Sequence, residues 1–242
     1  MTTRLPIAPE RIQATLPLVP RETHYLIDVL RLGDGADIEV FDGLGGRYRA
    51  RLNLENASLE LGERLPDLEE PSRLSIAPAL LKNDKLDWVI EKATELGTMR
   101  IEPFRSINCV VKLDESKAIQ RRERWQKIAA AASRQCGRAF IPEVQVPASL
   151  TDVVRGAHDR GELAIVLFER EIEHAFCELI PKIDSTQSIL IVTGPEGGFR
   201  DDEIEAVRAL GARTSSLGKR ILRAETAPIA ALAVAQGLRG QM

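Results

Sequence analysis

The segment SILIVTGPEGGF, residues 188–199, decides the fold of this chain. Its apolar first half is typical of a strand that is buried on both faces, as strands of parallel sheets are. Its second half is a glycine-rich turn, and a helical pattern follows it. In open α/β sheets, ligands bind where such turns leave the carboxyl ends of strands. The segment therefore predicts an α/β domain with a small-molecule site, although a turn of this kind on its own can also be purely structural.

A second segment, LGKRILRAETA at residues 217–227, makes this prediction more specific. It follows a short strand pattern and precedes an alanine-rich helical pattern over 227–236, with Pro228 in the first turn. Both segments thus connect a strand to a helix. We expect them to form two walls of one pocket, whose ligand the spacing alone describes only as a small molecule.

Strand and helix patterns alternate from about residue 72 onward, which is typical of a parallel α/β sheet. A helix is expected between Asp84, as its cap, and Gly97, and Pro78 must lie at the end of its strand or on an irregularity. The expected strands are 74–80, 100–104, 163–168 and 188–193, with another ending near 217, and the further helices are 117–136, a helix that ends before Gly211, and 227–236.

The first part of the chain has a different pattern. Residues 36–41, 47–52 and 57–61 alternate polar and apolar side chains, glycines separate the first two runs, and residues 24–32 can form a short helix. These features predict a small β-barrel-like domain over 1–66. A charged stretch with two prolines and no periodicity follows, so we place a linker at 67–73 and the second domain at 74–242.

Charge is unevenly distributed along the chain. Its 242 residues include 44% hydrophobic and 4% aromatic residues, and the formal net charge is −3. Basic residues nevertheless outnumber acidic ones between Arg100 and Arg138. A basic segment can bind a polyanion even in an acidic protein. The alternative, a solvated helix face, fits this charge pattern equally well.

Cysteines and histidines point to no further chemistry. Cys109, Cys136 and Cys177 are far apart, and the three histidines stand at no metal-ligand spacing from them, so we expect reduced thiols and no metal site. No apolar run approaches the roughly twenty residues that span a bilayer. These patterns predict a soluble, cytoplasmic protein with no membrane partner.

Several motifs occur in the order of a known family. They are HYLIDVLR at 24–31, VFDG at 40–43, KNDKLDWVIEKATELG at 82–97, RS at 105–106, RWQKIA at 124–129, and the two C-terminal segments. With them the chain resembles, over nearly its whole length, the SPOUT-class methyltransferases that form 3-methyluridine in bacterial 16S ribosomal RNA.

This resemblance implies a fold and a set of partners. The first domain would be a PUA-like β-barrel that helps to hold RNA, and the second a SPOUT domain whose C-terminal segment is threaded into a trefoil knot, an exception to the rule that chains avoid knots. S-adenosylmethionine would bind in the knot against the loops after Phe168, Thr193 and Leu217. The protein would be a homodimer that methylates small-subunit ribosomal RNA, free or within the ribosomal subunit.

The resemblance also assigns the cofactor contacts. They are Phe168, Thr193, Gly194, Pro195, Glu196, Gly197, Gly198, Leu217, Gly218, Ile221, Leu222, Glu225, Thr226 and Ala227. The three apolar residues of the second segment would wall the adenine, although such leucines are more often ordinary core. Glu196 and Glu225 can either hydrogen-bond the cofactor or hold a neighbouring loop. Thr226 can alternatively cap the last helix.

Methyl transfer to uridine N3 requires the base to lose a proton. Arg223 is our candidate for stabilising the developing negative charge, because a guanidinium stays charged and offers a planar fork of donors. Glu196 is the candidate general base, but its environment is invisible in the sequence. The expected catalytic residues are therefore Arg223 and Glu196.

Five arginines are the expected RNA contacts, namely Arg105, Arg134 and Arg138 in the second domain and Arg4 and Arg31 in the first. Basic side chains on phosphates provide affinity and register, so target choice would depend on groove shape and on extrusion of the uridine. Two other functions remain open: a SPOUT enzyme acting on tRNA or another RNA position, and a ribosome assembly factor that binds RNA without catalysis.

Three departures from the family pattern bear on these roles. The segment 134–138 reads RQCGR where the family has Glu-Gln-Ser-x-Arg, and residues 4–7 lack the usual aromatics. Arg200 replaces a serine that would begin a capping box, so Asp201 or Asp202 is expected to serve at that helix start.

Overall fold

The computed structural model describes residues 3–66 and 72–241, and the chain divides into two compact units. One consists of Met1–Glu70 with Ser133–Ile141, and the other of Pro71–Ala132 with Pro142–Met242. The sequence places 133–141 in the second domain, whereas the structure includes them in the first unit. Of the expected linker 67–73, residues 67–71 lie outside the described residues.

The second unit contains a six-stranded sheet in the order β13-β11-β12-β6-β7-β9, in which every pair of neighbours is parallel. The central strand β12 is buried along its whole length, which explains its continuous apolar sequence. The strands are β6 (Leu74–Pro78), β7 (Arg100–Ile101), β9 (Glu143–Val144), β11 (Leu163–Leu167), β12 (Ile189–Thr193) and β13 (Arg213–Ser215), and β8 (Phe104–Arg105) pairs separately with β10 (Ala148–Ser149). The α/β class is confirmed, and Pro78 is the last residue of its strand.

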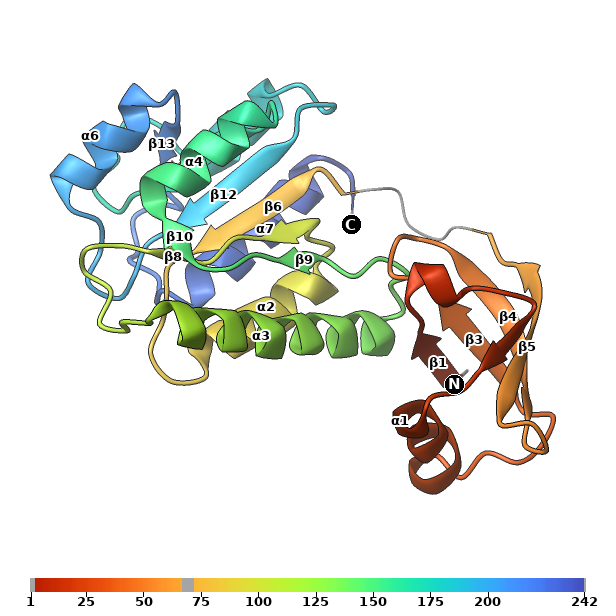
Figure 1. Cartoon of the computed structure of the whole chain (residues 1–242). Coiled ribbons are helices and arrows are strands. Elements are labelled where there is room, and N and C mark those ends of the chain that lie inside the picture. Colours follow the sequence, from red (N-terminus) through yellow and green to blue (C-terminus); the bar gives the residue numbers. More distant parts are fainter. Residues whose placement is uncertain (1–2, 67–71, 242) are drawn as a thin grey trace. The chain divides into compact units, whose positions relative to one another are not determined.

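Helices cover this sheet (Figure 1). Contacts join α2 to α7 and α7 to β6 and β12, while α4 packs on β11 and against α6. The helices are α2 (Lys85–Glu95), α3 (Glu115–Cys136), α4 (Leu150–Asp159), α5 (Phe176–Leu179), η3 (Ile180–Lys182), α6 (Asp201–Ala209) and α7 (Thr226–Leu238). Because all six strands run in the same direction, the loops after β6, β11, β12 and β13 meet at one edge of the sheet.

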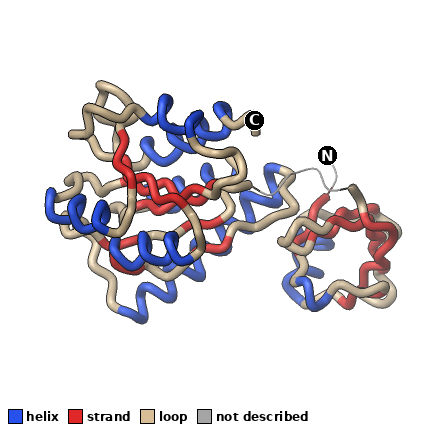
Figure 2. The backbone as a smooth tube through the Cα atoms, turned by 90° about the horizontal axis from the view of Figure 1, so that it is seen from above, coloured by secondary structure: helices blue, strands red, loops and turns tan. Residues whose placement is uncertain are grey.

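The first unit has a five-stranded sheet in the order β1-β3-β4-β5-β2, which curls into a ring in Figure 2. Its elements are β1 (Thr3–Pro6), η1 (Pro9–Arg11), β2 (Thr15–Pro17), α1 (Pro20–Thr23), η2 (His24–Val29), β3 (Asp37–Phe41), β4 (Arg47–Asn53) and β5 (Ser58–Arg64). Alternate strand residues such as Val40, Leu52 and Leu59 form its core with Leu26. The helix expected over 24–32 instead begins at Pro20, whose fixed φ suits a first helical position.

The segment Ser133–Ile141 joins this unit through backbone pairing. The N–H of Ile141 donates to the carbonyl of Gly43 at 3.0 Å, and the N–H of Gly45 donates to the carbonyl of Ala139 at 3.2 Å. Such contacts use main-chain groups that every residue carries. They leave no mark in the local sequence pattern, which is why the sequence assigns this segment to the other domain.

A buried carboxylate lies on β3 of the first unit. Glu39 accepts hydrogen bonds from Arg4 at 2.7 Å and from Arg47 at 2.8 and 3.0 Å, and all three side chains are about nine-tenths buried. Burial by itself would raise the pKa of Glu39, but hydrogen bonds from Arg47 and Arg4 outweigh it and hold the pKa below its ordinary value. Glu39 therefore stabilises the unit in its charged form.

This arrangement predicts a pH-dependent stability. A carboxylate with a lowered folded pKa contributes stability above its unfolded pKa of about 4.5, and that contribution is lost as the pH falls through the folded pKa. The melting temperature of Glu39→Gln should therefore lie furthest below wild type at neutral pH, and the gap should shrink below about pH 4. Asp37→Asn, which loses only an exposed pair with Arg51, should stay near wild type. A gap that does not depend on pH would contradict the assignment.

Candidate active site

The glycine turn at the end of β12 is shaped by close contacts. A Cβ on Gly194 would lie 2.9 Å from the Phe199 ring, and one on Gly198 would lie 2.7 Å from a carboxylate oxygen of Glu169. Gly198 also has a φ of +69° and donates its N–H to the carbonyl of Pro195 at 3.0 Å. The turn needs glycine at these positions because the side chains of Phe199 and Glu169 fill the space that a Cβ would take, and because of the positive φ of Gly198.

A residue that sequence reasoning missed holds this turn from outside. The side-chain amide of Asn108, in the loop after β8, donates to the carbonyls of Gly197 and Gly198 at 3.2 and 3.0 Å. A Cβ on Gly197 would lie 3.1 Å from the Cβ of Asn108. Only the neighbouring family motif at 105–106 pointed to this loop in the sequence.

Two carboxylates serve the start of α6: Asp202, one of the two aspartates that the sequence predicts for this role, accepts the N–H of Glu203 at 3.0 Å, and Glu203 itself makes further contacts. The Glu203 carboxylate accepts the N–H of Arg200 at 3.1 Å, the N–H of Ile107 at 3.0 Å and the hydroxyl of Ser106 at 3.1 Å. Arg200 instead pairs with Asp202 through its side chain, at 2.8 Å. One buried carboxylate thus closes the helix end and fixes the base of the loop that carries Asn108.

Removal of this carboxylate should destabilise the second unit. Glu203→Ala leaves the N–H groups of Arg200 and Ile107 without their acceptor, and an unsatisfied buried donor costs about 1–3 kcal/mol. We expect a loss of unfolding free energy in this range, measured by denaturant titration. The exposed Glu205 on the same helix is the control, because Glu205→Ala should change the free energy by no more than about 0.5 kcal/mol. Equal effects of the two substitutions would contradict this role.

The second predicted wall precedes α7. Leu217 and Leu222 are half-buried, whereas the side chain of Ile221 is 84% exposed. The carbonyl of Arg223 accepts the N–H groups of Thr226 and Ala227 at 2.9 and 3.0 Å, which starts the helix. Thr226 is the first helical residue and makes no side-chain cap, so the capping role considered for it is wrong.

Lys85, the first residue of α2, connects the two walls. Its ammonium lies 3.0 Å from Glu225 Oε2 and 3.5 Å from Glu196 Oε1. The N–H of Lys82 also donates to Glu196 Oε1 at 3.3 Å. Glu196 thus holds the loop between β6 and α2, and Glu225 pairs with the first residue of α2. A hydrogen bond from either glutamate to the cofactor stays a prediction.

Glu225 is kept ionised. Burial would raise its pKa, but its own backbone N–H, Lys85 and Arg223 together outweigh burial and leave the pKa below the ordinary value. A carboxylate of this kind is a weak base at neutral pH. The negative charge of Glu225 instead attracts the Lys85 ammonium and the Arg223 guanidinium.

The residues around the glycine turn fit a polar, close-lying cofactor. The hydroxyl of Thr193, at the end of β12, is buried and has no hydrogen-bond partner among the residues that the structure describes. A buried hydroxyl without a partner is costly, so a ligand that supplies one is favoured here.

Arg223 is placed to reach a substrate. Its side chain is exposed, and within the described parts of the chain it forms no hydrogen bond or ion pair. Glu225, two residues further on, is the negative charge that it influences. The catalytic roles of Arg223 and Glu196 stay predictions.

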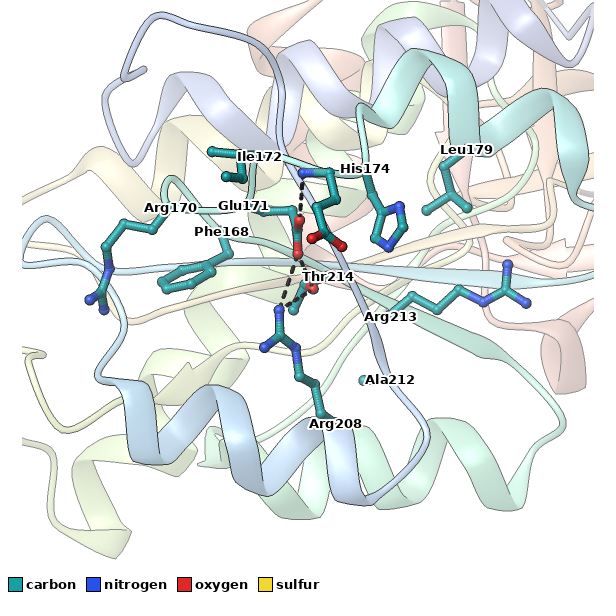
Figure 3. A pocket seen from close by; sticks show the side chains of 11 residues that line it. Phe168, Arg170, Glu171, Ile172, His174, Leu179, Arg208, Ala212, Arg213 and Thr214 are labelled. Carbon is teal, nitrogen blue, oxygen red and sulfur yellow. Dashed lines mark hydrogen bonds and ion pairs between the residues drawn. The ribbon is translucent and has the colours of Figure 1, made fainter.

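Phe168 lies at a cavity of about 760 Å³ beside the edge strand β13 (Figure 3). A network crosses this cavity, in which Glu171 accepts the Thr214 hydroxyl at 2.5 Å and the Arg208 guanidinium at 3.1 Å. The cavity is lined by Phe168, Arg170, Glu171, Ile172, Glu173, His174, Leu179, Arg208, Ala212, Arg213 and Thr214. Of the predicted cofactor contacts, Phe168 alone borders it, so this hollow and the loops joined by Lys85 are separate features.

The five arginines expected on RNA differ in their surroundings. The Arg4 guanidinium donates hydrogen bonds to Glu39 and to the carbonyls of Ser133 and Arg138. Arg138 is 7% exposed. Arg134 is half-buried over the Tyr25 ring, 4.8 Å from its centroid. Arg31 and Arg105 are exposed. Arg4 and Arg138 therefore have structural contacts within the first unit.

Neither a metal centre nor a membrane-spanning helix is found among the described residues. No group of three or more His, Cys, Asp or Glu side chains is arranged there to hold a metal ion. None of the helices in those ranges combines the length and the apolar character that crossing a bilayer requires.

The chain thus combines a parallel α/β unit, whose loops after four strands meet at one sheet edge, with a small curled β-sheet unit. A family model described as an RNA methyltransferase domain matches residues 68–236, and one described as an RNA methyltransferase PUA domain matches residues 20–60. The chain belongs to this family of RNA methyltransferases.

Relatives with assigned activities are similar over most of their length. The ribosomal RNA small subunit methyltransferase E of Bacillus subtilis is 35% identical to this chain. The aligned region covers 90% of this chain and 88% of the relative. The enzyme of the same name from Synechocystis is 36% identical, over 96% of this chain and 77% of the relative. These values confirm the resemblance to this class of ribosomal RNA methyltransferase.

Solved structures are similar as well. The Neisseria gonorrhoeae ribosomal RNA small subunit methyltransferase E, solved with S-adenosyl methionine, is 30% identical with a TM-score of 0.85, and 98% of each chain is covered. A methyltransferase from Legionella pneumophila with bound cofactor is 29% identical, also with a TM-score of 0.85 and 98% of each chain covered. The fold class is thereby confirmed, while the trefoil knot stays a prediction.

Proposed function

We propose that this chain transfers the methyl group of S-adenosylmethionine to N3 of a uridine in 16S ribosomal RNA. The observation that carries the proposal is the meeting of the glycine turn 194–198 with the segment 217–227 through Lys85 at the ligand edge of the sheet. The family membership names the reaction class, and the relatives named as small-subunit enzymes supply the substrate.

The cofactor would lie against the loops that follow β11, β12 and β13. Bound S-adenosylmethionine supplies an activated methyl group. Thr193 offers a buried hydroxyl without a partner among the described residues, while Leu217 and Leu222 offer half-buried apolar surface for an adenine. A slot that combines apolar walls with a few polar groups is typical of small-molecule sites.

Arg223 would stabilise the negative charge that develops when uridine N3 loses its proton. The exposed position and unpaired guanidinium of Arg223 support this role, because the side chain can turn to the base without breaking an existing contact. Glu196 is the less favoured member of the proposed pair, since its carboxylate already accepts from Lys82 and contacts Lys85. Its contribution would be to hold the turn rather than to remove the proton.

RNA would be held mainly by exposed arginines. Arg31 and Arg105 are the proposed phosphate contacts. Arg134 is a third candidate, although its guanidinium lies over the Tyr25 ring. Arg4 and Arg138 would act indirectly by shaping the first unit. Each phosphate contact adds affinity and salt dependence without sequence choice.

The active form would be a homodimer. Large apolar side chains are exposed on the loops around the site, with Ile107 58% and Val110 63% exposed beside Asn108, and Ile221 84% exposed in the second wall. Covering such side chains by a second copy would remove apolar surface from water. Light scattering should then give twice the mass of one chain, and a monomer at micromolar concentration would contradict this part.

The function is tested on ribosomal subunits that lack the modification. Purified protein and labelled S-adenosylmethionine should methylate hypomethylated small subunits, and mass mapping should place the methyl group on uridine N3. Methylation of tRNA alone would refute the substrate. Absence of cofactor binding at millimolar concentration, measured by calorimetry, would instead favour a non-catalytic assembly factor.

A further inference from the structure

Lys85 stands between two carboxylates from segments that are far apart in sequence. Glu196 belongs to the glycine turn after β12, and Glu225 precedes α7. The Lys85 ammonium contacts both, at 3.5 and 3.0 Å, and its side chain is 31% exposed. The contact with Glu225 raises the pKa of Lys85, so the lysine is fully charged at neutral pH.

The two glutamates would repel each other without this cation. Glu225 is held in its ionised form, with 18% of its side chain exposed, and Glu196 has 25% exposed. An ammonium has three donors and can serve two carboxylates at once. The contact with Glu225 Oε2 is an ion pair and not an aligned hydrogen bond, so it acts chiefly through charge.

The start of α2, which carries Lys85, is anchored to α3. Asp87, two residues further along α2, accepts the indole N–H of Trp125 at 2.9 Å and also pairs with Arg124. Trp125 is buried at 2% exposure. The α2 start therefore gives a firm position from which Lys85 reaches the two loops.

We propose that Lys85 is a positioning residue that sets the separation of the two walls of the cofactor site. The inference rests on the proposed function, since it takes the glycine turn and the segment 217–227 to be those walls. Lys85 does not touch the reacting atoms in this role. Its loss should weaken cofactor binding while the chemical step at saturating cofactor is retained.

Substitution of Lys85 by methionine removes the charge and keeps most of the side-chain length. Calorimetry with S-adenosylmethionine should show an affinity about tenfold weaker than wild type. In the methylation assay, KM for the cofactor should rise to a similar extent with kcat within about twofold. Lys85→Arg should recover most of the affinity, because it restores a cation of similar reach.

Lys92 provides a matched control on the same helix. Its ammonium contacts Glu91 and Glu95 at 2.7 Å each, and its side chain is 32% exposed, but both partners belong to α2. Lys92→Met therefore removes an equally exposed lysine with two carboxylate partners without uncoupling the loops. Its affinity for the cofactor should equal that of wild type.

The possible outcomes separate the inference from the proposed function. If the wild-type protein binds no S-adenosylmethionine, the proposed function fails first. If wild type binds and Lys85→Met binds equally well, or if Lys85→Met lowers the melting temperature alone, the positioning role is overturned. Weaker binding by Lys85→Met, unchanged binding by Lys92→Met and recovery by Lys85→Arg would establish it.

Discussion

Replacement of Arg223 by alanine should lower the rate of methyl transfer by about 10²–10³-fold, which is the loss seen when one donor to a developing negative charge is removed. The melting temperature should stay at the wild-type value, because the Arg223 side chain is exposed and has no partner within the described residues. Cofactor affinity measured by calorimetry should change little. The expected signature is a fall in kcat with an unchanged KM for S-adenosylmethionine.

The control for this prediction is Arg220, which lies in the same segment and is equally exposed. Arg220→Ala removes the same charge from the same loop, so a general loss of positive potential would affect both variants alike. We expect Arg220→Ala to keep most of the wild-type rate. Near wild-type turnover of Arg223→Ala would remove Arg223 from the mechanism.

Gly194→Ala should damage both stability and cofactor binding. The added Cβ would lie 2.9 Å from the Phe199 ring, which is 4% exposed and stacks on Phe104 with ring centroids 6.1 Å apart. Because this ring cannot move freely, the turn must shift, at the cost of about 1–3 kcal/mol that is typical of overpacking. Denaturant unfolding measures the first effect, and calorimetry with S-adenosylmethionine measures the second.

Gly237 offers a matched comparison in α7. A Cβ there would meet no atom within 4 Å, so Gly237→Ala should be neutral or stabilise by up to about 1 kcal/mol. The double variant Gly194→Ala with Phe199→Leu should recover part of the cofactor affinity, since the smaller side chain makes room for the new methyl group. Wild-type affinity in Gly194→Ala would show that the turn is not a wall of the site.

Features that depend on local pattern could be predicted from the sequence. The continuous apolar run of β12, the position of Pro78 at the end of β6 and the helix that ends before Gly97 all follow from residue types within a few positions of each other. The same holds for the glycine turn, whose place between a strand and a helix identified the ligand edge of the sheet.

Features that depend on contacts between distant segments could not be predicted. The sequence treats Arg4 and Arg138 as RNA contacts, but Arg138 is buried in the first unit, and Arg4, with 10% of its side chain exposed, is held there by Glu39. Pairing of Ile141 with Gly43 moves the segment 133–141 to that unit. An arginine looks the same in a sequence whether its partner is a phosphate or a carboxylate 35 residues away, as Glu39 is from Arg4.

By itself, the sequence determined the α/β class, the glycine turn between β12 and α6 and, through its motifs, the family of RNA methyltransferases. Only the tertiary structure decided why Gly194 must be glycine, how Asn108 and Glu203 hold the turn, and that Lys85 joins Glu196 to Glu225. The physical reason is that periodicity and turn chemistry act over a few residues, whereas charge pairing and close packing act across space between segments that the folded chain brings together.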